Sequence, residues 1–90
     1  MTIHKFIHNK KNQRVGVILA APISDTDAGV GWSLCHRSKG DKFDKTLAVQ
    51  IATDRVQHGT KLSVPSSLKK HYDEMVVRAN KYFKGHKITA

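Results

Sequence analysis

Basic side chains recur along the last third of the sequence at a spacing that would turn them toward solvent on a helix. Between residues 65 and 84 the apolar side chains follow steps of three and four residues, the period of one helix face. Lys70, Arg78 and Lys81 fall outside that stripe and lie within about three turns of one another. Such a row of cations can contact successive phosphates and release counterions, which drives the electrostatic part of nucleic-acid binding. The segment therefore predicts a helix that binds a polyanion.

The predicted contact set has two parts, one on the last helix and just beyond it, the other in the first hairpin of the chain. The residues are Lys69, Lys70, Arg78, Lys81, Lys84 and Lys87, assisted by Lys10, Lys11 and Arg14. The chain has 16 Lys and Arg against 7 Asp and Glu, a formal net charge of +9, which exceeds what solubility alone requires. Glu74 lies four residues from both Lys70 and Arg78 and partly neutralises them, so a merely solvated basic surface is the competing interpretation.

Other pairs of reactive residues have simpler explanations. Cys35 and His36 would point to opposite faces of a strand, so they cannot act together as a nucleophile and its base. His4 and His8 would share a strand face but lie roughly 13 Å apart, too far to hold one metal ion. We therefore expect a protein that is not an enzyme, with no catalytic residue, no metal site and no cofactor.

Three short strands are expected in the first half of the chain. Their ranges are 4–8, 15–21 and 30–36. Polar loops between them favour antiparallel pairing. On the third strand Trp32 shares a face with Val30 and Leu34, and a core position is favoured for it over a role in stacking on a base.

Two helices are expected in the second half. Asp41 is the candidate cap of the first, with Asp44 near its positive end. Its apolar stripe would consist of Phe43, Leu47 and Ile51 with Ala48 and Ala52. The second helix follows Pro65 and ends at Gly85. Its stripe comprises Leu68, Tyr72, Met75, Val76, Ala79, Tyr82 and Phe83. The predicted fold class is α+β, a three-stranded antiparallel sheet followed by two helices (β-β-β-α-α) that cover one face of the sheet.

Length and composition place the chain among small intracellular domains. Ninety residues make a single basic domain spanning 1–90. One cysteine excludes an internal disulfide, and no apolar run reaches the 18 residues that a membrane span requires. We therefore expect a cytoplasmic protein with no membrane partner.

Part of the sequence resembles small tailed-bacteriophage proteins. The similarity covers roughly residues 15–58 and consists of the run GWSLC at 31–35, the run DKFDK at 41–45, and then Ala52 with Arg55. Those phage proteins are largely uncharacterised, so the resemblance implies a source and no activity. It implies an accessory protein in the cytoplasm of an infected bacterium, where such proteins commonly bind a nucleic acid or a host protein.

Two functions from different classes follow. The first is a nucleic-acid-binding module with a regulatory or accessory role, whose partner is DNA or RNA. The second is a protein-interaction module that binds an acidic host protein as an inhibitor or anti-defence factor, with the basic surface steering association and an exposed sheet edge adding a strand. Self-association is compatible with both, since a symmetric homodimer would hide apolar surface left by a small core.

Overall fold

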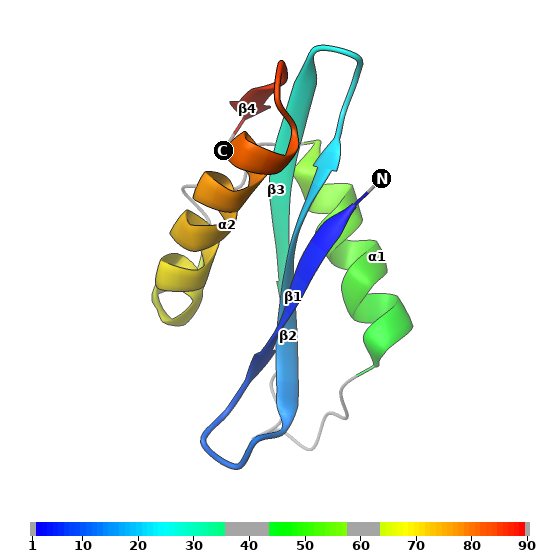
Figure 1. The fold of residues 1–90 in the computed structure, drawn as a ribbon. Coiled ribbons are helices and arrows are strands. Elements are labelled where there is room, and N and C mark those ends of the chain that lie inside the picture. Colours follow the sequence, from blue (N-terminus) through cyan, green and yellow to red (C-terminus); the bar gives the residue numbers. More distant parts are fainter. Residues whose placement is uncertain (1, 36–43, 58–63, 90) are drawn as a thin grey trace.

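The fold is a four-stranded mixed sheet with one helix on each face (Figure 1). A computed structural model describes residues 2–35, 44–57 and 64–89 of the chain. The elements are β1 (Ile3–His8), β2 (Arg14–Pro22), β3 (Asp27–Leu34), α1 (Lys45–Val56), a 3₁₀ turn (Ser66–Leu68), α2 (Lys69–Tyr82) and β4 (Lys87–Thr89). The α+β class and the three consecutive strands are confirmed. The sheet has one strand more than predicted.

Strands β1, β2 and β3 pair antiparallel in chain order, as the short polar connections predict. The β1–β2 turn is closed by Asn9, whose carboxamide oxygen accepts from the backbone N–H groups of Lys11 and Gln13. Asn12 supplies the left-handed conformation that the turn requires, with φ 61°. Alternation then divides the buried side chains of β2 between the two faces. Ile18 and Ala20 lie on one face and Val17, Leu19 and Ala21 on the other.

The two helices cover opposite faces of the sheet, so the expectation of a single covered face is wrong. α2 packs on the face of Ile18 and Ala20, and α1 packs on the face of Val17 and Leu19. The reason lies in β2, where the six consecutive residues from Gly16 to Ala21 are buried, which gives both faces an apolar surface to cover. A strand apolar on both faces is typical of a sheet between two layers.

α1 lies very close to the backbone of β3. A side chain at Gly31 would collide with the carbonyl oxygen of Ala52, and one at Gly29 would meet that of Val56 at 2.5 Å. The helix therefore buries small residues at four-residue steps, Ala48, Ala52 and Val56. The predicted stripe is wrong at Leu47, which is 52% exposed, and Ile51 is only partly buried. Large side chains on that face would hold the helix away from the glycines.

The helix boundaries follow from local hydrogen bonds. Asp44, not Asp41, is the N-cap of α1, because its carboxylate accepts from the N–H of Leu47 at 3.1 Å. Asp41, Phe43, His36 and Gly59 lie outside the described residues. α2 follows Pro65 through the 3₁₀ turn and ends at Tyr82. Gly85, with φ 86°, turns the chain back toward the sheet.

The last strand, β4, was not predicted from the sequence. It pairs parallel to the start of β3, with Lys87 opposite Asp27 and Ile88 opposite Ala28. The sheet order is β1-β2-β3-β4, so β1 forms one edge along its whole length. The molecule is elongated, with extents of 41 × 21 × 21 Å. The β1–β2 turn and β4 lie toward opposite ends of it (Figure 1).

Candidate nucleic-acid interface

The outer face of α2 carries four cations that the structure leaves exposed. The helix is held to the sheet by Tyr72, Met75 and Ala79, which are almost fully buried. The residues on the opposite side of α2 therefore face solvent. We define the α2 basic face as Lys70, Arg78, Lys81 and Lys84, the last lying in the turn just beyond the helix. This part of the predicted contact set is brought together along one rod about 20 Å long.

The α2 basic face is not neutralised by ion pairs. Over residues 2–35, 44–57 and 64–89, the one ion pair joins Lys5 of β1 to Glu74, with 3.7 Å between Nζ and Oε2. Both side chains are about half exposed, so the pair contributes little to stability. The helix itself has four basic side chains against the two carboxylates of Asp73 and Glu74. α1 with its capping Asp44 has two of each sign. The excess positive charge of the helices is thus on α2.

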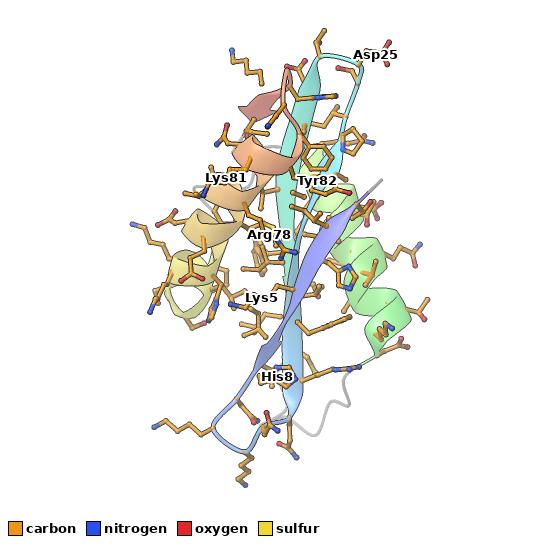
Figure 2. All side chains as sticks on the ribbon, viewed as in Figure 1. Lys5, His8, Asp25, Arg78, Lys81 and Tyr82 are labelled. Carbon is orange, nitrogen blue, oxygen red and sulfur yellow. The ribbon has the colours of Figure 1, made fainter. Side chains whose placement is uncertain are left out.

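Lys5 is a basic residue of this region that sequence reasoning missed. It projects from β1 on the side of α2, where Nζ lies 3.7 Å from Glu74 and 3.5 Å from Nδ1 of His71. Arg78 follows Glu74 by one helical turn, and Figure 2 shows Lys5 and Arg78 on the side of the molecule where α2 meets β1. The signal was present in the sequence. Lys5 lies between Ile3 and Ile7 on the same face of β1, and the side chains of these two residues are buried against the α2 layer.

The other predicted cations do not join the α2 basic face. Lys69 is exposed one turn before Asp73, on the flank of α2 away from Glu74. Lys87 is exposed on β4. Lys10 and Lys11 are exposed in the β1–β2 turn, at the end of the sheet opposite β4 (Figure 1). The predicted contact set is therefore spread along the length of the molecule.

Arg14 lies on the α1 side of the sheet, not with the lysines of the last helix. Its guanidinium carbon is 4.8 Å from the centre of the Phe6 ring, and Nζ of Lys45 is 5.6 Å from the same point. His4 meets this ring edge-on at 5.2 Å. Phe6 packs against the α1 layer, so this second cationic group faces away from α2. Arg14 therefore does not lie beside the α2 basic face.

Trp32 is a core residue of the edge of β3, as favoured from the sequence. It packs against the α2 layer and its ring is covered by Arg55, whose guanidinium carbon lies 3.9 Å from the ring centre. Arg55 also donates a hydrogen bond to the Trp32 carbonyl oxygen at 2.9 Å. The indole nitrogen is buried with no hydrogen-bond partner in the described structure. Arg55 thus occupies one face of the Trp32 ring. Helices cover both faces of the sheet over β2 and β3, so the sheet has no open face there for a ligand.

Tyr82 is a further residue of this region whose position was not predicted correctly from the sequence. It was predicted in the buried stripe of the last helix, but its side chain is 49% exposed. It lies one turn after Arg78 and directly after Lys81, and Figure 2 shows it at the end of α2 near those two residues. An exposed aromatic ring is therefore part of the same basic region.

Among the residues that the structure describes, no group of three His, Cys, Asp or Glu side chains is arranged to hold a metal ion. No described helix is long and apolar enough to cross a membrane. Cys35 is partly buried, and its backbone N–H donates to the Val15 carbonyl oxygen.

No protein-family model, no curated protein and no solved structure matches the sequence or the fold.

Proposed function

We propose that the protein is a non-enzymatic nucleic-acid-binding module whose α2 basic face contacts phosphates. The observation that carries the proposal is the position of four exposed cations on one face of α2, none of them paired with a carboxylate in the described structure. Lys and Arg side chains that neutralise phosphates release the cations condensed on a nucleic acid, and this release favours binding. Lys5 extends this surface onto β1, and the lysines of the β1–β2 turn assist at the far end.

The phage context is part of the same proposal. The GWSLC and DKFDK runs support an accessory or regulatory role in the cytoplasm of an infected bacterium. GWSLC forms the second half of β3 and the residue after it, and the described part of DKFDK contains the Asp44 cap of α1. These runs therefore serve packing and capping in the structure, and the ligand surface lies on α2, outside the region of resemblance.

The test is binding of labelled duplex DNA, single-stranded DNA and RNA by nuclease-treated protein over a series of salt concentrations. The triple variant K70A/R78A/K81A should bind more weakly and with a shallower salt dependence. Removing three phosphate contacts should lower the slope of log K against log salt by about 2–3 units, on the order of 0.7–0.9 per contact. A folded triple variant with unchanged affinity and slope would contradict the assignment to α2.

Two matched variants separate a local contact from the effect of net charge. K10A/K11A/R14A removes the same three charges from the opposite end and from the α1 side, so its loss of affinity should be smaller. E74Q removes the carboxylate between Lys70 and Arg78 and should strengthen binding. Equal losses in the two triple variants would show that only net charge matters. Absence of binding to all three nucleic acids at low salt would refute the function.

A second candidate is a module that binds an acidic host protein, and one observation favours it. β1 is an edge strand of six residues, and its outer side pairs with no described strand. An acidic segment in an extended conformation could pair with this edge as an additional strand, next to His4, Lys5 and His8. A stoichiometric protein partner that remains after nuclease treatment, and that is lost when Ile7 is replaced by Pro, would support this reading. Ile7→Pro must first be shown to fold.

A further inference from the structure

Tyr82 is exposed at the end of α2, although the apolar residues on either side of it in the sequence are buried. Ala79 is fully buried and Phe83 is 7% exposed, yet Tyr82 between them is 49% exposed. Its ring meets the Phe83 ring edge-on, with 5.0 Å between centroids and an interplanar angle of 81°. An edge-to-face contact uses one side of the exposed ring and leaves a flat π-face without a ring partner. The buried Phe83 therefore holds the orientation of an aromatic surface that faces solvent.

The charges around Tyr82 are positive. Arg78 precedes it by one helical turn, Lys81 is its neighbour in sequence, and Lys84 follows in the turn after the helix. The closest carboxylate of α2 is Glu74, two turns away and already 3.7 Å from Lys5. Figure 2 shows Arg78, Lys81 and Tyr82 together on the last turns of α2. An aromatic face next to cations that form no ion pair among the described residues is the combination that proteins use to bind single-stranded nucleic acids.

We propose that Tyr82 stacks on an unpaired base, and that the ligand of the α2 basic face is therefore a single-stranded nucleic acid. The proposal rests on the proposed function, since it names the form of the same ligand. In a duplex both faces of each base are covered by neighbouring bases, so the ring could contact only the backbone. In a single strand a base can turn outward onto Tyr82 while the adjoining phosphates contact Arg78 and Lys81.

A purely structural role for Tyr82 makes a different prediction. If the side chain served only to shield Phe83, an aliphatic residue of similar size would replace it without loss of binding. Stacking needs the flat π-face and not the hydroxyl group. Tyr82→Leu and Tyr82→Phe therefore distinguish the two roles, because both retain bulk over Phe83 and only the second retains the ring.

The experiment compares a single-stranded oligonucleotide with the duplex of the same sequence, using the full chain. Y82L should weaken binding of the single strand by about 5- to 150-fold, the range expected for loss of one base–aromatic stack. Y82F should bind within about twofold of the unaltered protein, since it keeps the π-face. Binding of the duplex should be the same for all three proteins. L47A is the matched control, because Leu47 is an exposed apolar residue at 52% exposure on α1, across the sheet from α2, and it should leave both affinities unchanged.

The outcomes separate this inference from the proposed function. If Y82L binds the single strand as well as the unaltered protein does, while K70A/R78A/K81A still loses affinity, stacking is refuted and the phosphate-binding surface stands. If Y82L weakens the duplex and the single strand equally, the assignment to a single strand is refuted. If the unaltered protein binds neither nucleic acid, both proposals are refuted. Thermal unfolding of each variant shows that it is folded, which the exposure of Tyr82 leads us to expect.

Discussion

Replacing Gly31 with alanine should separate α1 from the sheet. The added Cβ would collide with the carbonyl oxygen of Ala52, far inside the 3.0 Å below which real Cβ contacts essentially never fall, and would lie 3.0 Å from a methyl carbon of Val56. The helix must then move away from β3 by roughly 1 Å or more, enough to lose a large part of its van der Waals contact. The side chains that α1 buries are small, Ala48, Ala52 and Val56, so no flexible group can absorb the displacement.

The magnitude follows from opposing effects. Overpacking of a tight interface costs typically about 1–3 kcal/mol, and here the obstacle is backbone. Alanine also restricts the unfolded chain, which offsets about 0.4–1 kcal/mol of that cost. We expect a net destabilisation of about 2 kcal/mol, a large share of the roughly 5–15 kcal/mol typical of a folded domain. Chemical unfolding followed by circular dichroism and by the fluorescence of Trp32 measures this free energy of unfolding.

Two controls make the expectation specific to the clash. Gly85→Ala adds a methyl group with nothing within 4 Å but at φ 86°, so it should cost about 1 kcal/mol through backbone strain alone. Adding Ala52→Gly to Gly31→Ala should give no rescue, because the atom in the way is the carbonyl oxygen of residue 52 and not its methyl group. A Gly31→Ala protein within 0.5 kcal/mol of the original, or rescue by Ala52→Gly, would refute the close packing of α1 on β3.

Two further predictions concern α1. Asp44→Ala should destabilise the protein by about 1 kcal/mol, because it removes the acceptor for the Leu47 N–H, whereas Asp44→Asn should keep most of the cap; equal unfolding midpoints for all three proteins would contradict this. Arg55→Leu should shift Trp32 emission to longer wavelength and destabilise the fold by about 1–2 kcal/mol, because the guanidinium covers the indole ring and bonds its carbonyl oxygen. Unchanged emission in the Leu variant would show that Arg55 does not shield Trp32.

The first three strands could be predicted because each is a short run rich in strand-forming residues and ends at residues that favour turns. Trp32, Val30 and Leu34 share a face as expected, and the pairing of β1 with β2 and β3 is antiparallel as expected. The layer arrangement could not be predicted by treating each strand as one-sided. β2 is buried on both faces, so a helix was needed on each.

The α1 surface was misjudged because side-chain size was taken as the guide to burial. Leu47 is larger and more apolar than Ala48, yet Ala48 is buried and Leu47 is exposed. The deciding residues are Gly29 and Gly31 on a different element, whose missing side chains admit only a helix with a small-residue face. Strand β4 was missed for a related reason. Three residues carry too little pattern, and their pairing with β3 depends on where the turn at Gly85 directs the chain.

The candidate site was predictable where it lies on one element and not where two elements combine. The cations of α2 follow from helical spacing alone, since the buried stripe fixes which side is exposed. Lys5 enters the region from β1, and its contact with Glu74 depends on how α2 crosses the sheet. Tyr82 falls at the helical spacing for burial, but its side chain is 49% exposed at the end of α2, and spacing along one helix does not show where the packing against the sheet stops.

The two helices meet the sheet in unlike ways, and this difference bears on how such a protein can change over generations. α1 is held by backbone-to-backbone proximity, which forbids nearly every substitution at Gly29 and Gly31. α2 is held by Tyr72, Met75 and Ala79 and leaves its charged side unconstrained by packing. Selection for folding and selection for a ligand therefore act on separate residues. A lineage carrying this domain can exchange the charges of α2, and with them the ligand that we propose for this face, while the architecture stays as it is.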